Sequence, residues 1–166
     1  MRLPCSFYWP DQLTSAEPFH EGLPHGVAKQ FSANGRVIGT YTMVHGTGID
    51  LWRGEREDGS IYLAEVLYLR DGRRQGFEWW INDDQKTVHE ERHWDEGLLH
   101  GIWREWNEAG RLRKGFPKYH LKGEQVTKRV YLKACAHDST LPAFRIQDNR
   151  PARAFPREIR RKLTPP

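Results

Sequence analysis

The sequence predicts a mainly β fold: an elongated antiparallel meander of about four β-hairpin repeats of about 25 residues each, followed by a short C-terminal helix. Glycines recur at a nearly constant spacing along the first three quarters of the chain. A second set of turn residues lies midway between them. Between each closing glycine and the next mid-unit turn, apolar residues recur at equivalent positions four residues apart, as expected for one face of a strand.

The glycines that close each unit are Gly22, Gly46, Gly72, Gly97 and Gly123. Three units open with G-x-x-[HQ]-G, at residues 22–26, 72–76 and 97–101, whereas the second reads His45-Gly46-Thr47-Gly48. The simplest interpretation of His25 and His100 is that each packs on or caps a return turn. A structural role in turns is expected for Gly22, Gly26, Gly35, Gly59, Gly72, Gly76, Gly97, Gly101 and Gly110.

The turns in the middle of the units lie at Asn34-Gly35, Asp58-Gly59, Asp84-Gln85 and Ala109-Gly110. Asn-Gly and Asp-Gly tolerate positive φ at both central positions, so we expect type I′ hairpin turns there. Each unit is then a strand, a tight turn, a second strand and a return turn. The four units predict about eight strands in one sheet with a right-handed twist.

The strands carry recurring apolar positions. One column on the outgoing strands comprises Val27, Leu51, Phe77 and Ile102, and a looser column comprises Phe31, Glu55, Ile81 and Trp106. The returning strands carry an aromatic residue shortly before the next glycine, and we expect these residues to form the aromatic core: Tyr41, Tyr68, Trp94 and Tyr119.

The two ends differ from the repeat region, which spans residues 21–123. We expect residues 1–20 to cover the edge of the first hairpin, because an exposed sheet edge invites aggregation. In residues 124–166, a final strand or helix start precedes a basic tail. Phe155, Ile159 and Leu163 fit one side of a helix and are expected to pack on the last repeat, leaving Arg157, Arg160 and Arg161 in solvent.

Composition limits the protein class. No stretch approaches the roughly 18 apolar residues that span a bilayer, and the N-terminus lacks a secretion signal, so we expect a cytoplasmic protein. Cys5 and Cys135 are too far apart for a local metal knuckle, and whether they pair is open. Residues 124–166 hold 10 Lys and Arg against 4 Asp and Glu. A basic tail attracts an acidic protein, anionic lipid or nucleic acid, and charge alone does not choose among them, so no specific nucleic acid is predicted as a partner.

The segment His89–His93 reads HEERH, which matches the H-E-x-x-H signature of zinc proteases. That signature needs both histidines on one side of a helix, whereas residues 86–96 occupy the position of a strand in the other units. Four residues of strand span about 13 Å, too far for one ion. We therefore expect no metal, cofactor or catalytic residue, with a zinc metallohydrolase as the remote alternative. His89, Glu91 and His93 are expected to share one strand face.

The glycine spacing, the G-x-x-[HQ]-G openings and the aromatic positions together resemble MORN repeats (membrane occupation and recognition nexus). The resemblance covers residues 21–123 and is closer to the bacterial variant found in antitoxin-type proteins. Gln85 and the altered second unit depart from the pattern. The resemblance implies an antitoxin- or immunity-like protein that binds a toxin or effector, or else a membrane-associated or scaffolding protein.

A sheet one layer thick cannot bury every tryptophan, and adjacent Trp79 and Trp80 must point to opposite faces. Aromatic residues and arginine dominate protein interfaces. The predicted partner-binding residues are therefore Trp52, Trp79, Trp80, Trp103, Trp106, Arg157, Arg160 and Arg161. The binding face and the oligomeric state stay open.

Overall fold

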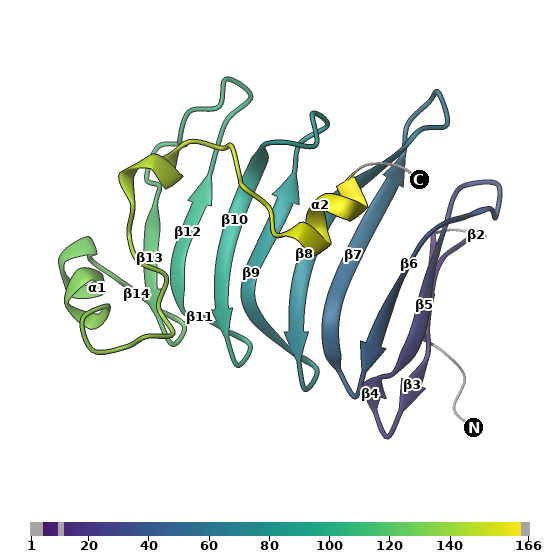
Figure 1. Cartoon of the computed structure of the whole chain (residues 1–166), viewed down its shortest axis with the longest axis horizontal. Coiled ribbons are helices and arrows are strands. Elements are labelled where there is room, and N and C mark those ends of the chain that lie inside the picture. Colours follow the sequence, from purple (N-terminus) through teal and green to yellow (C-terminus); the bar gives the residue numbers. More distant parts are fainter. Residues whose placement is uncertain (1–4, 10–11, 164–166) are drawn as a thin grey trace.

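The computed structural model of the chain describes residues 5–9 and 12–163. One antiparallel sheet forms most of the molecule, and its main strands follow one another in chain order (Figure 1). The predicted meander with a short C-terminal helix is confirmed. Within the described residues, no helix has the length and apolar character needed to cross a membrane.

The strands group into hairpins. β1 and β2 come first, and β2 pairs with β5, so it extends the sheet beyond the first repeat hairpin. The bounds of the N-terminal strands are β1 (Cys5–Trp9), β2 (Gln12–Glu17), β3 (Phe19–His20) and β4 (Leu23–Pro24). The repeat hairpins are β5 (Gly26–Phe31) with β6 (Val37–Val44), β7 (Thr47–Glu55) with β8 (Ile61–Arg70), β9 (Arg73–Ile81) with β10 (Val88–Asp95), and β12 (Gly101–Glu105) with β13 (Lys118–Leu121). The short strands are β11 (Leu98–Leu99) and β14 (Glu124–Val126).

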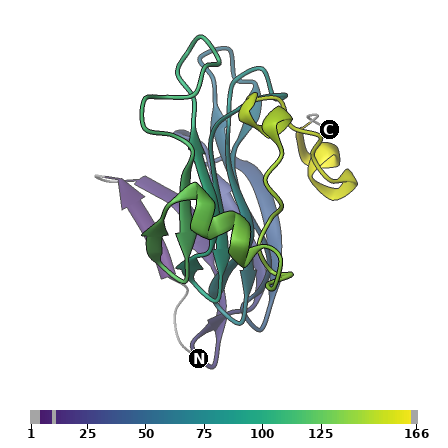
Figure 2. The ribbon, with the colours of Figure 1, turned by 90° about the vertical axis from the view of Figure 1, so that its left-hand side faces the viewer.

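All helices follow the last strand. They are α1 (Lys128–Ala134), the 3₁₀ helix η1 (Ile146–Asn149) and α2 (Arg157–Leu163). The segment from α1 to α2 runs back over one face of the sheet (Figures 1 and 2). We call this the helical face; it carries Leu51, Trp79 and Ile102. The other face, which carries Asp50, Glu78 and Trp80, is called the open face because no described helix lies over it (Figure 2).

The mid-unit turns differ from the prediction in type, and the type I′ conformation occurs at the return turns instead. At the return turns two successive residues have positive φ, as in Glu96 (48°) and Gly97 (84°), which is the type I′ pattern. In the first mid-unit turn only Gly35 has positive φ. Asn34 Oδ1 accepts hydrogen bonds from Arg36 N and Ser32 Oγ. The prediction of type I′ turns at mid-unit is therefore wrong: three of these turns are three-residue loops that end in a glycine bulge, and in the third unit Gln85 has the positive φ in a loop one residue longer.

A ladder of hydrogen bonds joins successive return turns and explains the G-x-x-[HQ]-G pattern. In the three units that have the pattern, its fourth residue accepts a hydrogen bond from the first residue of the next return turn, and in the second unit Thr47, which follows Gly46, is the acceptor. The four bonds are His45 N to His25 Nδ1 (3.1 Å), Asp71 N to Thr47 Oγ1 (3.1 Å), Glu96 N to Gln75 Oε1 (3.0 Å) and Lys122 N to His100 Nδ1 (3.0 Å). His25 and His100 thus cap return turns, as expected.

All nine glycines assigned to turns have positive φ. At Gly101 a close approach adds to this conformational demand. A Cβ there would lie 2.6 Å from the Cβ of His93, which packs across the hairpin. At this position the second glycine of the pattern is thus required by sterics as well as by backbone conformation.

We expect His100→Ala to lower the free energy of unfolding by about 1–3 kcal/mol, because it leaves the Lys122 amide without its acceptor. Nε2 of the same ring also contacts Asp138 Oδ2 (3.2 Å) and Thr140 Oγ1 (3.1 Å). His100→Gln keeps an acceptor, as Gln75 does in the third unit, and should lose less. Urea denaturation of the two variants measures the difference, and equal losses would contradict this role.

The aromatic residues of the returning strands do not form one core, contrary to the prediction. Tyr41 and Trp94 lie on the open face, where they bond to carboxylates, whereas Tyr68 and Tyr119 lie on the helical face. The reason is the distance to the next return glycine. It is an odd number of residues for Tyr41 and Trp94 and an even number for the other two. Strand side chains alternate with a period of two, so this parity decides the face.

The C-terminal segment lies elsewhere than predicted. Phe155 and Ile159 are buried, as the stripe indicated, but α2 packs over the middle of the sheet and not on the last repeat. Phe155 meets the Trp79 ring edge to face at 5.5 Å, and the Tyr68 hydroxyl donates a hydrogen bond to Glu158. The run between η1 and α2 carries the chain back across β12 and β10, so the apolar stripe packs on β8 and β9 (Figure 1).

Candidate functional site

The five predicted tryptophans separate by face. Trp79 and Trp80 point to opposite faces, as alternation requires. Trp79 and Trp106 lie under the C-terminal segment and are only 7% and 3% exposed. Trp79 Nε1 donates to Glu91 and Trp106 Nε1 to the Asn149 carbonyl. Both are therefore buried and offer a partner little surface, although Trp106 borders the hollow described below, whereas Trp52, Trp80 and Trp103 lie on the open face.

Aromatic and acidic side chains form one row across the open face. Strand pairing sets Trp52 opposite Glu65, Glu65 opposite Trp80, Trp80 opposite Glu90 and Glu90 opposite Glu105. This lateral row therefore runs straight across β7, β8, β9, β10 and β12. Opposed side chains of an antiparallel pair have Cβ atoms about 5 Å apart. The row places two tryptophans about 10 Å apart, with a carboxyl group beside each.

A second set of carboxyl groups lies deeper on the same face. Glu78 is 1% exposed and accepts a hydrogen bond from Trp94 Nε1 (2.8 Å). It also shares a hydrogen bond with Glu65. Asp50 lies on β7 of the same face, within reach of the Tyr41 and Trp52 side chains. In the sequence these acidic residues resemble ordinary surface positions of a strand, so nothing indicated that they are buried.

Burial raises the pKa of Glu65 to about 8, and the hydrogen bond and charge of Glu78 act in the same direction. The charge of Arg74 acts against the shift. Burial and the charge of Glu17 likewise raise the pKa of Asp50 to about 6. The Glu65 and Asp50 carboxyl groups of the open face therefore keep their protons to a higher pH than ordinary carboxyl groups do.

These shifts predict a pH dependence of stability. Between pH 4.5 and 8 the folded state holds the Glu65 proton more tightly than the unfolded chain, so stability falls as pH rises through that window. Partial exposure of Glu65 reduces the size of the effect. Glu65→Gln should flatten the slope of unfolding free energy between pH 6 and 8, while exposed Glu57→Gln should leave it unchanged. An equal slope in the Glu65 variant would contradict the assignment.

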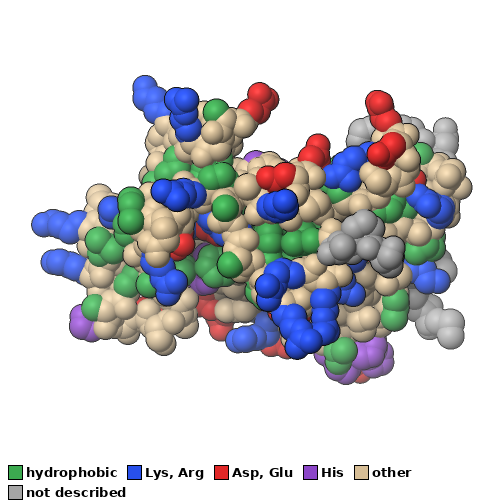
Figure 3. All heavy atoms as spheres, turned by 45° about the horizontal axis from the view of Figure 1, so that its top comes forward, with side chains coloured by type: hydrophobic (Ala, Val, Ile, Leu, Met, Phe, Trp, Pro, Cys, Tyr) green, Lys and Arg blue, Asp and Glu red, His purple; other side chains and the backbone are tan. Residues whose placement is uncertain are grey.

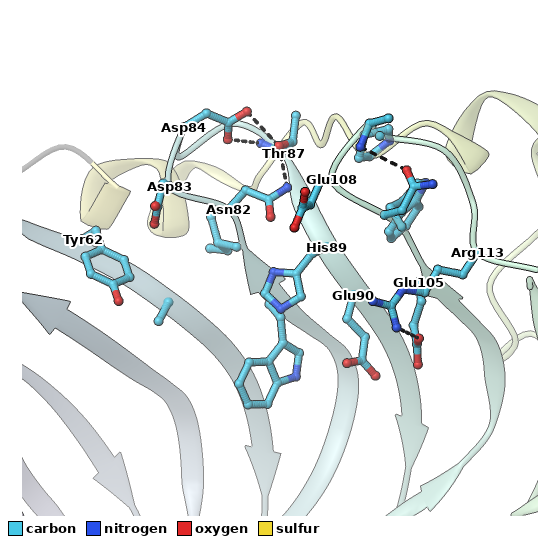
Figure 4. A pocket seen from close by; sticks show the side chains of 18 residues that line it. Tyr62, Asn82, Asp83, Asp84, Thr87, His89, Glu90, Glu105, Glu108 and Arg113 are labelled. Carbon is cyan, nitrogen blue, oxygen red and sulfur yellow. Dashed lines mark hydrogen bonds and ion pairs between the residues drawn. The ribbon is translucent and has the colours of Figure 1, made fainter. Parts of the chain in front are cut away.

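A hollow of about 1490 Å³ opens where the lateral row meets the loops that follow β9 and β12 (Figure 4). Tyr62 and Trp80 supply aromatic surface. Five carboxylates line it, Asp83, Asp84, Glu90, Glu105 and Glu108, against one guanidinium, Arg113. Small-molecule sites measure about 300–1,000 Å³. The hollow, at about 1490 Å³, is larger than this range.

The HEERH segment is a strand, and its residues do not share one face. A register shift between Val88 and Glu90 marks a β-bulge. Because of it His89 lines the hollow, 6.2 Å from the Trp80 ring, whereas Glu91 and His93 point to the helical face. The expectation that His89, Glu91 and His93 lie side by side is wrong. An extra residue in a strand reverses the alternation that the prediction assumed.

Glu91 is the centre of a buried ion-pair network on the helical face. It is 2% exposed and accepts hydrogen bonds from Arg104 Nη1 (2.6 Å), Arg153 Nε (2.6 Å) and Trp79 Nε1 (2.8 Å). Burial alone would raise the pKa of Glu91, but Arg153 and Arg104 outweigh it and hold the pKa below its usual value. Because Arg153 belongs to the C-terminal segment, this network fastens that segment to the sheet.

The predicted arginines of α2 are exposed. Arg157, Arg160 and Arg161 point away from the buried stripe of Phe155 and Ile159. Lys and Arg side chains gather at this helix in the space-filling view (Figure 3). They lie on the helical face and are therefore separate from the hollow.

Histidines also gather at one corner of the sheet (Figure 3). The ring centroids of His20, His25 and His45 lie 4.4–5.9 Å apart. Among the described residues, no group of three or more His, Cys, Asp or Glu side chains is arranged to hold a metal ion. Cys135 is a free thiol, and the side chain of Cys5 lies outside the described part of the chain.

Comparison with protein-family models, with curated proteins and with solved structures finds no match to this chain in any of the three.

Proposed function

We propose that the chain is a non-catalytic binding protein whose open face holds a protein partner. The observation that carries this proposal is the hollow, with its aromatic surface at Tyr62 and Trp80 and its rim of carboxylates. Aromatic side chains bury a large area at low entropic cost, and they are the residues that most often dominate binding energy. Acidic groups around them favour a partner of opposite charge.

The sheet also supplies a rigid support. Ladder hydrogen bonds of the return turns link each unit to the next, and the Glu91 network fixes the segment behind the sheet. A site whose groups are held in place before binding loses less entropy when a partner arrives. Trp52 and Trp80 are held in this way two strands apart. This arrangement suits recognition of a surface or an extended segment.

The finer proposal follows from the resemblance to bacterial MORN-like proteins: the partner is a toxin or effector, and the chain acts as an antitoxin or immunity protein. An acidic, aromatic surface suits this role when the partner carries a basic region. The resemblance supports the kind of partner, and the lateral row supports the place where it binds.

The test is affinity isolation from the source organism with the tagged chain as bait. We expect one protein to be retained by the wild-type chain and lost with Trp80→Ala. An Ile146→Ala variant is the matched control, because Ile146 is 69% exposed and belongs to η1. Retention of the same protein by the Trp80 variant, with loss in the control, would place binding elsewhere. Circular dichroism of both variants checks that they are folded.

A second candidate is association with an anionic lipid surface through α2. The exposed Arg157, Arg160 and Arg161 favour it electrostatically. The apolar stripe of the helix is buried in the core, so only the positive charge of α2 can attract the lipid surface. Co-sedimentation with vesicles containing anionic lipid tests it. Binding that is lost in an Arg157→Gln, Arg160→Gln, Arg161→Gln triple variant supports this candidate, and unchanged binding contradicts it.

A further inference from the structure

We infer that the hollow receives an arginine or lysine side chain of the partner, which lies over the Trp80 ring between the surrounding carboxylates. This inference rests on the proposed function and names the chemistry of the partner: a basic polypeptide segment. Three observations carry it, namely the cations on the other rings of the open face, the charge of the lining and the position of the chain's own basic residues.

Three other rings on this side of the sheet already carry cations. The guanidinium of Arg56 lies 4.6 Å from the Tyr62 ring centre and that of Arg74 lies 4.7 Å from the Trp94 ring centre. The Trp103 ring has Arg92 and Lys118, each at 4.8 Å. Among the described residues, Trp80 has no cation over its ring. A cation within about 6 Å of the Trp80 face would give this ring the contact that Tyr62, Trp94 and Trp103 already have.

The charge of the lining favours a cation. Glu105 pairs with Arg113 (3.6 Å), and Glu90 pairs with Arg92. Asp83 and Glu108 are exposed and form no ion pair in the described part of the chain. These two carboxylates project from neighbouring loops on the rim of the hollow (Figure 4). A basic side chain of a partner would neutralise them with little desolvation of the buried groups.

The chain does not supply this cation itself from its basic tail. The described basic residues of α2 lie on the helical face (Figure 2), whereas Trp80, Glu90 and Glu105 of the hollow lie on the open face. The volume of about 1490 Å³ exceeds that of a single side chain several times over, so main chain around the basic residue also fits. A polypeptide segment therefore suits the hollow better than a small free cation.

The experiment uses a capped decapeptide of Gly and Ser with three arginines, and an otherwise identical peptide in which citrulline replaces arginine. Isothermal titration calorimetry at 50 mM NaCl measures binding to the full chain. We expect the arginine peptide to bind at least tenfold more tightly than the citrulline peptide, and its affinity to fall when NaCl is raised to 300 mM. Spermine should compete only weakly.

Two double variants locate the site. Asp83→Asn with Glu108→Gln should weaken binding of the arginine peptide about fivefold. Glu21→Gln with Glu124→Gln removes the same charge from exposed positions outside the hollow and should have little effect. All four positions are exposed, so both variants should keep the fold. Equal weakening in the two variants would overturn the inference, because the peptide would then sense only net charge.

Equal binding of the citrulline peptide would overturn the basic-segment inference. So would complete displacement of the arginine peptide by spermine at equal concentration, or a binding signal that arises from self-association of the chain. The proposed function is tested separately, by isolation of the partner protein from the source organism. If that partner is lost with Trp80→Ala but retained by the Asp83 and Glu108 double variant, the open face binds a protein and the cation inference alone fails.

Discussion

Glu91→Ala is expected to lower the free energy of unfolding by about 3–5 kcal/mol, the cost of leaving buried charges without a partner. Glu91 is 2% exposed and bonds to Arg104, Arg153 and Trp79. Its removal leaves two guanidinium groups in the core with no carboxylate. Chemical denaturation followed by tryptophan fluorescence measures the loss, and the C-terminal segment should also become accessible to proteases.

Glu90→Gln is the matched control, because Glu90 is the neighbouring residue and points to the open face. Its ion pair with Arg92 is partly exposed, and we expect a loss of about 1 kcal/mol or less. A Glu91 variant no less stable than the Glu90 variant would show that the network does not hold the segment to the sheet. Arg153→Ala should reproduce part of the Glu91 effect, and the two changes should not be additive.

Phe155→Ala is expected to cause the second large loss of unfolding free energy. Phe155 is 4% exposed and its ring meets Trp79 edge to face, so truncation should cost about 3–5 kcal/mol. We expect the C-terminal segment to open locally and trypsin to cleave at the arginines of α2. A loss of 3 kcal/mol corresponds to a more than hundredfold rise in the open population, and to a similar rise in cleavage rate.

Phe155→Leu tests whether the loss of packing area at this position causes the C-terminal segment to open. Leucine keeps much of the buried area, so its cleavage rate should lie near that of the wild-type chain. Emission from Trp79 should shift to longer wavelength in the alanine variant as water reaches the ring. An unchanged cleavage rate in Phe155→Ala would mean that α2 is not held by this contact.

Much of the fold follows from spacing in the sequence. Glycine recurrence predicts the hairpins and their order because each return turn needs residues that tolerate positive φ. His25 and His100 could be assigned to turns for the same reason. The mid-unit turn type could not, because Asn34 bonds to Arg36 and Ser32, and this leaves positive φ to Gly35 alone.

The candidate site was harder to predict. Alternation alone places Trp79 and Trp80 on opposite faces, but which face is covered depends on where the C-terminal segment returns. The bulge beside Val88 moves His89 to the hollow and cannot be seen in residue types. Counting from each return glycine would have separated Tyr41 and Trp94 from Tyr68 and Tyr119. Long-range packing, rather than local pattern, decides the rest.

The central claim is that the open face binds a protein partner while the helical face is structural. Amide hydrogen exchange of the chain, alone and in complex with the protein isolated from its host, tests it most directly. We predict protection in the loops around residues 82–87 and 107–110 and in the strand segments that carry Trp80 and Glu90. Protection confined to α2 and the segment before it, with the open face unchanged, would contradict the account.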